Sequence, residues 1–317
     1  MSGQSLNPGA WAKIGRWLTP AKLTPRARTL AWASLITEII IVGTGGSVRL
    51  TASGLGCPTW PQCTPGSLIP TPELGFHAIV EFSNRMMSGV VAIVALFTFL
   101  FLVRQRTSRP ELFWLSFCLG VLVLVQAGIG GITVLSNLES YIVGLHFILS
   151  AIMIVLATAL VWFVYLPDGR SQPLAGWIRS LAAAIAAATA VTVVVGVLTT
   201  GSGPHAGDVD TPRNGLATEI LEHVHAWPAY ALFALTAVIV VAVWRTNVAS
   251  TRNLALWLLG LEILQIAVGL YQSRTGVPPL AVGVHMVFAC ILIAVTTAVV
   301  LSTTRPRPAH AAGSERQ

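Results

Sequence analysis

The chain has 317 residues, of which 54% are hydrophobic and only 10% are charged, and its mean hydropathy is +0.75. This composition excludes an ordinary soluble domain, in which about 25% of residues are charged, and indicates an integral membrane protein. We interpret the net charge of +7 and the isoelectric point of about 9.8 as signs of membrane orientation, so no nucleic-acid partner is expected.

Eight apolar segments are long enough to cross a bilayer as helices, which takes about 20 residues each. Residues 1–28 are polar, basic and contain proline, so we expect no cleavable signal peptide and a first span that acts as its own insertion signal. The predicted fold is therefore an all-α integral membrane protein with eight transmembrane helices. In chain order the predicted spans cover 30–50, 75–103, 112–133, 141–165, 177–200, 218–244, 254–273 and 281–302.

The basic residues indicate how the chain is oriented. Of the 19 Lys and Arg, 15 fall in the two tails and in the connections after spans 2, 4 and 6. The positive-inside rule then predicts that both termini are cytoplasmic. The basic residues near the other, outer side are Arg49, Arg85, Arg213 and Arg274.

Two cysteines, Cys57 and Cys63, lie in the connection between spans 1 and 2, which the charge rule places outside. An oxidising exterior permits a disulfide between them, and their spacing excludes a Cys-x2-Cys metal site. A structural role and a redox role for this pair both stay open. Cys118 and Cys290 fall within spans, where we expect them to be small core residues.

Histidines recur at one depth of the predicted bundle. Since every even-numbered span runs from outside to inside, histidines near the start of these spans share a level below the outer surface. A single histidine of this kind is usually a satisfied core residue, but four helices that each offer one favour a ligand site in the bundle interior. Paired imidazoles on apolar helices suit a haem, which needs only axial ligands, better than a bare metal ion. The five histidines are His77, His146, His223, His225 and His285.

Span 2 carries the largest set of polar residues. One helical face collects five of them at spacings of i, i+4, i+7, i+8 and i+11. Glu81 and Arg85 are also an i,i+4 pair of opposite charge. Two interpretations of this face remain. It is either a polar seam stabilised by an internal salt bridge or a row of catalytic polar side chains. Its residues are His77, Glu81, Asn84, Arg85 and Ser88.

Two parts of the chain repeat each other at an offset of 139 residues. Four matches within 21 positions are improbable by chance, so we infer an internal duplication into two pseudo-symmetric four-helix bundles. An even number of helices per half gives a parallel repeat, which disfavours a transporter with inverted repeats. The matches are Gln126 with Gln265, Gly130 with Gly269, Gly144 with Gly283, and His146 with His285. The predicted division is a tail at 1–29, an N-terminal half at 30–165, a linker at 166–176, a C-terminal half at 177–302 and a tail at 303–317.

Span 6 partly repeats the polar pattern of span 2 in the sequence Glu222-His-Val-His225. Glu222 aligns with Glu81, and His225 aligns with Asn84. This alignment makes His225 a better ligand candidate than His223, which points away from it at a spacing of two residues.

Two connections carry motifs that resemble those of the haem A synthase family. They read Val48-Arg-Leu-Thr-Ala-Ser-Gly54-Leu-Gly-Cys57-Pro-Thr-Trp-Pro-Gln-Cys63 and Thr200-Gly-Ser-Gly-Pro-His205-Ala-Gly-Asp208. Together with the histidine pattern, the resemblance extends from residue 30 to about residue 302. It implies a bacterial cell-membrane enzyme that oxidises the ring D methyl group of haem O to a formyl group by successive hydroxylations, giving haem A for cytochrome oxidase.

The resemblance also implies cofactors and partners. Haem b is the implied cofactor and haem O the implied substrate. The implied partners are membrane lipid, the farnesylating haem O synthase and a membrane electron donor, and a homo-oligomer is left open. The outer cysteine pair either passes electrons or shapes the haem entrance.

The family's ligand residues carry over with one departure. The resemblance assigns His225 and His285 to haem b, although Ala226 stands where the family has an arginine after the first of these. It assigns His146 to the substrate haem. The span 2 motif of the family then requires a histidine, where this chain has Asn84.

That motif reads Glu81-Phe-Ser-Asn84-Arg85 in this chain. Either His77, two turns earlier on the same face, replaces the missing ligand, or the substrate haem keeps one histidine and an open axial position. A carboxylate such as Glu81 is expected to stabilise positive charge at the methyl carbon or to accept its proton. The alternative function is a membrane di-haem cytochrome b-type electron carrier without haem-modifying activity, which would not need Glu81.

Overall fold

The structure, a computed structural model, describes residue 13 and residues 15–166, 173–244 and 248–304. Part of the predicted tail 1–29, most of the linker 166–176 and nearly all of the tail 303–317 lie outside the described residues. The same holds for His310 and for five basic residues that support the predicted orientation, Arg170, Arg245, Arg305, Arg307 and Arg316.

Eight helices in the described part of the chain are long and apolar enough to cross a membrane. Each predicted span coincides with one of them to within a few residues, which confirms the predicted fold class. The helices are α2 (Pro25–Leu50), α3 (Gly75–Leu102), α4 (Pro110–Leu135), α5 (Ser140–Val164), α6 (Gly176–Ser202), α7 (Thr218–Trp244), α8 (Ala249–Arg274) and α9 (Pro279–Thr304). Two short 3-10 helices, η1 (Pro72–Leu74) and η2 (Val103–Arg106), flank α3.

The first span begins earlier than hydropathy predicts, at residue 25 in place of 30. Thr24 caps the helix because its side chain accepts a hydrogen bond from the backbone N–H of Ala27 at 3.3 Å. Pro25 occupies the first turn, where a missing N–H leaves no helical hydrogen bond unmade. The basic side chains of this turn lower its hydropathy, so only the cap marks the start.

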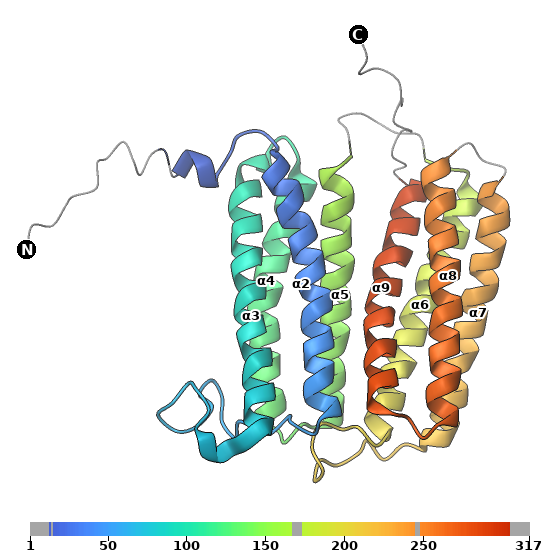
Figure 1. Ribbon diagram of the computed structural model, residues 1–317. Helices are drawn as coiled ribbons and strands as arrows, with labels where there is room; N and C mark the ends of the chain where they lie inside the picture. The colour runs from blue at the N-terminus through green and yellow to red at the C-terminus, as the bar shows by residue number, and fades with distance from the viewer. Residues whose placement is uncertain (1–12, 14, 167–172, 245–247, 305–317) are drawn as a thin grey trace, which may run out of the picture.

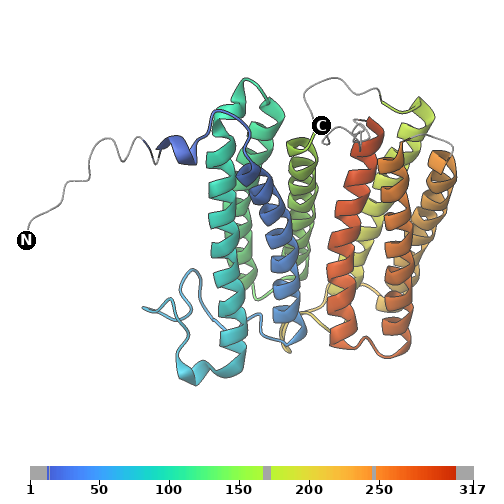
Figure 2. The same ribbon diagram turned by 45° about the horizontal axis from the view of Figure 1, so that its top comes forward.

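The helices form two bundles that lie side by side (Figure 1). Helices α2 to α5 pack into one bundle and α6 to α9 into the other, and the turned view separates them in the same way (Figure 2). We call them the first and the second bundle. Along the seam, α9 packs against α2 and α5, and α5 packs against α6. The larger apolar core contains Cys290, Ile293 and Ala294 of α9 beside residues of the first bundle, so the two halves share a core.

Many large apolar side chains lie on the outward faces of the bundles, as expected where lipid is the solvent. Leu124 and Trp257 are each 73% exposed. Cys290 is buried, as predicted, but the prediction that Cys118 is a core residue is wrong, because it is exposed. Lipid and protein core are both apolar, so hydropathy does not distinguish a lipid-facing position from a core position.

Four connections, 51–71, 136–139, 203–217 and 275–278, lie together at the lower end of Figure 1, which we call the loop end. The backbone N–H of Gly54 donates to the carbonyl of Gly207 at 2.8 Å. Nε2 of His205 lies 2.8 Å from the carbonyl oxygen of Val277. The loops of the two bundles therefore contact each other over the seam.

Candidate functional site

His225 of α7 and His285 of α9 face each other inside the second bundle. Their ring centroids are 6.4 Å apart, and the ring planes are inclined at 70°. Each lies about two turns into a helix that starts at the loop end, so the rings share one depth. A metal–imidazole bond measures about 2.0–2.1 Å, so one iron between the two rings requires a centroid separation of this size.

Each of these rings lies in a slot formed by a glycine of the neighbouring helix. A Cβ on Gly196 of α6 would lie 2.8 Å from Cε1 of His225, and one on Gly269 of α8 would lie 3.4 Å from Cε1 of His285. The Nδ1 atoms of both histidines are buried and have no hydrogen-bond partner among the described residues. Unpaired nitrogens in an apolar interior are costly, so these two rings are candidates for holding a bound group.

His146 of α5 repeats this arrangement in the first bundle. A Cβ on Gly130 of α4 would lie 3.2 Å from its Cε1, and its Nδ1 is buried without a partner in the described part of the chain. Nε2 of Gln126 donates to the carbonyl of His146 at 3.0 Å, and Nε2 of Gln265 donates to that of His285 at the same distance. The glutamine, glycine and histidine of the sequence repeat therefore form one structural unit that occurs twice.

These donor sets fit a haem. Two imidazoles on facing apolar helices supply axial ligands, and a porphyrin supplies the remaining four nitrogens itself. Over residues 15–166, 173–244 and 248–304, no group of three or more His, Cys, Asp or Glu is placed to hold a bare metal ion. The residues present therefore suit a group that brings its own equatorial ligands.

The sequence alignment of spans 2 and 6 pairs Asn84 of α3 with His225 of α7. A Cβ on Gly45 of α2 would lie 3.9 Å from both amide atoms of Asn84, just as Gly196 of α6 backs His225. The hydroxyl of Thr44 donates to Oδ1 of Asn84 at 2.7 Å. The hydrogen bond from Thr44 therefore holds the amide of Asn84 beside α2.

Two other histidines lie outside these units. His77 is exposed in the first turn of α3, and its Nδ1 lies 2.9 Å from the hydroxyl of Ser53. Seven residues separate it from Asn84, which is about 10 Å along a helix. His223 is exposed on α7, whereas His225 faces the bundle interior.

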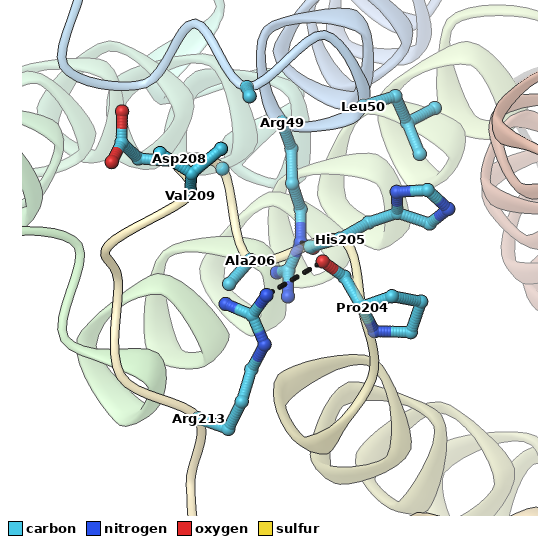
Figure 3. A pocket seen from close by; sticks show the side chains of 10 residues that line it. Arg49, Leu50, Pro204, His205, Ala206, Asp208, Val209 and Arg213 are labelled. Atoms are coloured by element: carbon cyan, nitrogen blue, oxygen red, sulfur yellow. Dashed lines mark hydrogen bonds between the residues drawn. The ribbon is translucent and has the colours of Figure 1, made fainter.

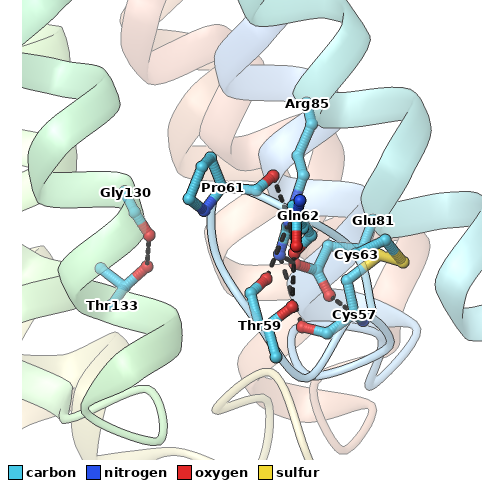
Figure 4. A network of polar contacts seen from close by, with 9 residues as sticks. All are labelled: Cys57, Thr59, Pro61, Gln62, Cys63, Glu81, Arg85, Gly130 and Thr133. Atoms are coloured by element: carbon cyan, nitrogen blue, oxygen red, sulfur yellow. Dashed lines mark hydrogen bonds and ion pairs between the residues drawn. A yellow bond between two sulfur atoms is a disulfide. The ribbon is translucent and has the colours of Figure 1, made fainter. Parts of the chain in front are cut away.

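Glu81 and Arg85 join α3 to the 51–71 loop (Figure 4). Nη2 and Nε of Arg85 donate to Oε1 of Glu81 at 2.5 and 3.1 Å, forming the salt bridge that the spacing predicts. Oε2 of Glu81 accepts the backbone N–H of Cys57 at 2.7 Å. Nη1 of Arg85 donates to the carbonyls of Thr59 and Gln62 at 3.0 and 3.2 Å. The carboxylate is therefore bound on both oxygens and only 5% of the residue is exposed.

The predicted disulfide is present. Cys57 and Cys63 are bonded and completely buried, with Cα atoms 4.5 Å apart. Their buried surroundings include Ala78 and Phe82 of α3. The disulfide therefore holds the loop against the start of α3, beside Glu81.

The 51–71 loop crosses from α3 to the other side of the first bundle. Trp60 packs so closely on α4 that a Cβ on Gly131 would lie 2.5 Å from its ring. Gly54 lies against Leu138 of the 136–139 connection, where a Cβ would approach the leucine to 2.6 Å. The loop therefore covers the mouth of the first bundle at the loop end.

Sequence reasoning missed several residues of these sites. Thr44 and Ser53 have ordinary polar side chains in a helix and a loop, and no local pattern marks their partners. Gly45 and Gly196 lie close to the ends of α2 and α6, but the repeat offset of 139 residues does not align them, so the repeat does not mark them.

The sequence matches the family described as cytochrome oxidase assembly protein over residues 28–297. It is 29% identical over 261 residues to Heme A synthase of Symbiobacterium thermophilum, an alignment that covers 76% of this chain and 84% of that protein. The chain belongs to the haem A synthase family. This confirms the resemblance predicted from the two loop motifs.

Shorter alignments reach other members of the haem A synthase family. Heme A synthase of Alkalihalophilus pseudofirmus is 34% identical over 146 residues, and that of Lysinibacillus sphaericus is 35% identical over 147 residues. Each alignment covers 45% of this chain. The chain spans about half the length of these two curated relatives, 48% and 47% respectively.

Proposed function

We propose that this chain is a haem A synthase that oxidises the ring D methyl group of haem O to a formyl group. Family membership supports this activity, as do the relatives named Heme A synthase. The observation that carries the proposal is the difference between the two bundles. One pairs two histidines, whereas the other has one histidine and Asn84 beneath a loop that holds a carboxylate at its mouth.

In the second bundle we assign His225 and His285 as the residues that would hold haem b. A haem held by two imidazoles supplies one-electron transfer. The slots at Gly196 and Gly269 limit rotation of the two rings, and the surrounding core of α6 to α9 excludes water. This bundle therefore suits an electron carrier.

Replacing His285 with Ala tests this assignment. The variant is expected to lose the low-spin bis-histidine absorption spectrum of haem b, because one of the two axial ligands is removed. His223→Ala is the control, because His223 lies two residues before His225 on the same helix but its side chain is exposed. An unchanged spectrum in His285→Ala would show that another residue ligates this haem.

In the first bundle we assign His146 as the ligand of haem O. An amide is a poor iron ligand, and Asn84 accepts a hydrogen bond from Thr44, so we infer an open axial position on that side. The competing assignment of His77 requires it to leave Ser53 and to act about 10 Å further along the helix. The observed contacts of His77 favour the open position.

We assign Glu81 to the chemistry at the methyl carbon. Oxidation of a methyl group beside a porphyrin creates positive charge and releases a proton. A carboxylate in a water-excluded site stabilises such charge or accepts such a proton. Arg85 and the backbone N–H of Cys57 hold both carboxylate oxygens, so the carboxylate is preorganised rather than mobile. In this assignment Arg85 acts as a positioning residue.

The proposed enzyme is a multi-pass protein of the bacterial cell membrane with both termini in the cytoplasm. This orientation puts the loop end, and both haem sites near it, at the outer face. Haem O then reaches the first bundle from the membrane, supplied by the farnesylating enzyme. A membrane electron donor supplies the electrons that hydroxylation with O2 requires, whereas hydroxylation with water would need an electron acceptor in its place.

A di-haem electron carrier is the rival function. Such a carrier needs a pair of histidines for each haem, so both bundles would be expected to contain one pair. It does not need a buried carboxylate. Asn84 in the ligand position of the first bundle and the engaged carboxylate of Glu81 both argue against it.

Haem analysis decides between them. The chain is expressed in a bacterium that makes haem O but lacks its own haem A synthase, and extracted haems are separated by liquid chromatography. Haem A is expected alongside haem b. Haem O without any haem A, from protein that binds haem b normally, would favour the electron carrier.

A further inference from the structure

A polar cavity lies at the loop end. Its volume is about 210 Å³, and it lies between the end of α2 and the 203–217 loop (Figure 3). A volume of this size holds about seven waters, so it accepts a charged group of a few atoms but not a whole haem. Arg49 of α2 and Arg213 of the loop both point into it.

Only some of the N–H groups of the two guanidinium groups donate hydrogen bonds to the protein. Arg49 donates from Nε to the carbonyl of His205 and from Nη2 to that of Thr200 at 2.8 Å. Arg213 donates from Nη1 and Nη2 to the carbonyls of Thr211 and Pro204, both at 2.8 Å. A guanidinium has five N–H donors, so within the described residues each arginine keeps three for another partner.

Within the described part of the chain, no carboxylate forms an ion pair with either arginine. The ion pairs of the described residues involve Arg85 and Arg109, and neither Arg49 nor Arg213 takes part in one. Asp208 lines the cavity, but its carboxylate lies at the far side in Figure 3 and accepts the backbone N–H of Asp210 at 3.0 Å. Two like charges that share a cavity repel each other unless an anion lies between them.

The position of these arginines is unusual. The positive-inside rule depletes basic residues from the side to which the loop end belongs. Of the four basic residues near that side, Arg85 is paired with Glu81 and Arg274 is exposed at the end of α8. The remaining two converge on one cavity.

We propose that Arg49 and Arg213 form an oxyanion site that takes a carboxylate or phosphate group. Paired arginines bind such groups through short, charge-assisted hydrogen bonds in a fixed fork geometry. The group comes either from a haem propionate or from the phosphate of an anionic lipid. A haem propionate can be the bound group only if one of the two bundles holds a haem, so this source rests on the proposed function.

The test uses the purified full chain in detergent and compares Arg213→Gln with Arg274→Gln. Both changes remove one positive charge at the loop end, but only the first touches the cavity. Inorganic phosphate is expected to raise the melting temperature of the wild-type protein and of Arg274→Gln, and to leave Arg213→Gln unchanged. Should Arg213→Gln fail to fold, Arg213→Lys replaces it, since it keeps the charge but loses the fork.

Two further measurements identify the source. Iron protoporphyrin IX and its dimethyl ester are titrated into the protein and followed by absorption, and phosphatidylglycerol retention is measured by native mass spectrometry. A propionate source predicts that Arg213→Gln weakens binding of the free acid about tenfold but leaves binding of the ester unchanged. A lipid source predicts that Arg213→Gln retains less phosphatidylglycerol than the wild-type protein. Binding of iron protoporphyrin IX and of its dimethyl ester should then be the same in the variant and in the wild-type protein.

The proposal is wrong if phosphate, haem and lipid binding are all the same in Arg213→Gln and Arg274→Gln. Because these readouts measure binding and not haem A formation, they separate failure of the anion site from failure of the proposed activity. A chain that makes haem A normally but shows no difference between the two variants would retain its function and lose this site.

Discussion

At the scale of single residues, Asn84 is where this chain departs from the histidine pattern of its family. Thr44 donates a hydrogen bond to its amide, and Gly45 leaves room for it against α2. The same position in the second bundle holds His225, backed by Gly196. A glycine of the preceding helix therefore lies beside each of these two side chains.

Replacing Asn84 with His is expected to convert the substrate haem of the first bundle to a six-coordinate, low-spin state. The imidazole would fill the axial position that the amide leaves open. Absorption and electron paramagnetic resonance spectra of protein loaded with haem O measure this change. His77→Ala is the companion variant, and it should leave the spectrum of the loaded wild-type protein unchanged. Loss of a ligand in His77→Ala would instead identify His77 as the replacement ligand.

Glu81 is the second residue on which the proposed activity depends. Glu81→Gln keeps the size of the side chain but removes the negative charge, and its single amide oxygen can accept only one of the two sets of hydrogen bonds, that from Arg85 or that from Cys57. We expect the variant to bind haem b and to lower haem A output about a hundredfold, with haem O or an alcohol intermediate accumulating. The measurement is the haem composition of membranes by liquid chromatography.

Glu222→Gln is the matched control, because the repeat aligns Glu222 with Glu81 and its side chain is exposed. It should leave haem A output unchanged. Near-normal output from Glu81→Gln would confine Glu81 to its salt bridge with Arg85 and its hydrogen bond to the 51–71 loop.

At the scale of elements, the helix pairs are joined by close approaches at glycines. Gly196 of α6 lies against the ring of His225 of α7. Because glycine has no side chain, the imidazole fits between the two helices. Gly260 lies on α8, where a Cβ would meet no atom within 4 Å. The two positions therefore differ in packing although both are glycines within membrane helices.

Gly196→Ala is expected to weaken haem b binding about tenfold or more. A Cβ 2.8 Å from Cε1 of His225 forces the ring or the helix to move, and such overpacking costs about 1–3 kcal/mol. Gly260→Ala should leave haem b binding unchanged, since it adds a methyl group to open space. Haem b occupancy after purification, from the ratio of haem to protein absorbance, tests both. Equal occupancy in the two variants would show that His225 does not depend on the slot.

At the scale of the whole molecule, the four connections of the loop end bring together segments that are far apart in the chain. Arg49 of the first bundle bonds the carbonyls of Thr200 and His205, and Gly54 bonds Gly207. These contacts tie the two bundles together over the seam that α9 and α2 share. His146, the facing rings of His225 and His285, and the arginine cavity therefore lie near one end of the two bundles.

The charge distribution predicts that this face is the outer one. A fluorescent protein fused to the C-terminus should fluoresce in living cells, because the cytoplasm permits it to fold. Alkaline phosphatase inserted into the 203–217 loop should be active, because it requires an oxidising exterior. The reverse pattern would place the loop end in the cytoplasm and overturn the orientation.

Several features followed from the sequence by itself. A bilayer demands about 20 apolar residues per helix and internal hydrogen bonding of the backbone, so the spans could be read from composition and length. The repeat made His146 and His285 equivalent, and the loop motifs identified the family. The short separation of Cys57 and Cys63 along the chain was enough to predict their pairing, because nearby residues in an exterior loop meet easily.

Other features were decided only by the tertiary structure. Whether Cys118 faces lipid or core depends on how the helices are rotated against each other, and hydropathy is the same for both. The bond from Thr44 to Asn84, the bond from Cys57 to Glu81 and the convergence of Arg49 on Arg213 join different elements of the chain. Such contacts depend on the distances between packed helices and on the path of the loops, and no local pattern of residues specifies these distances.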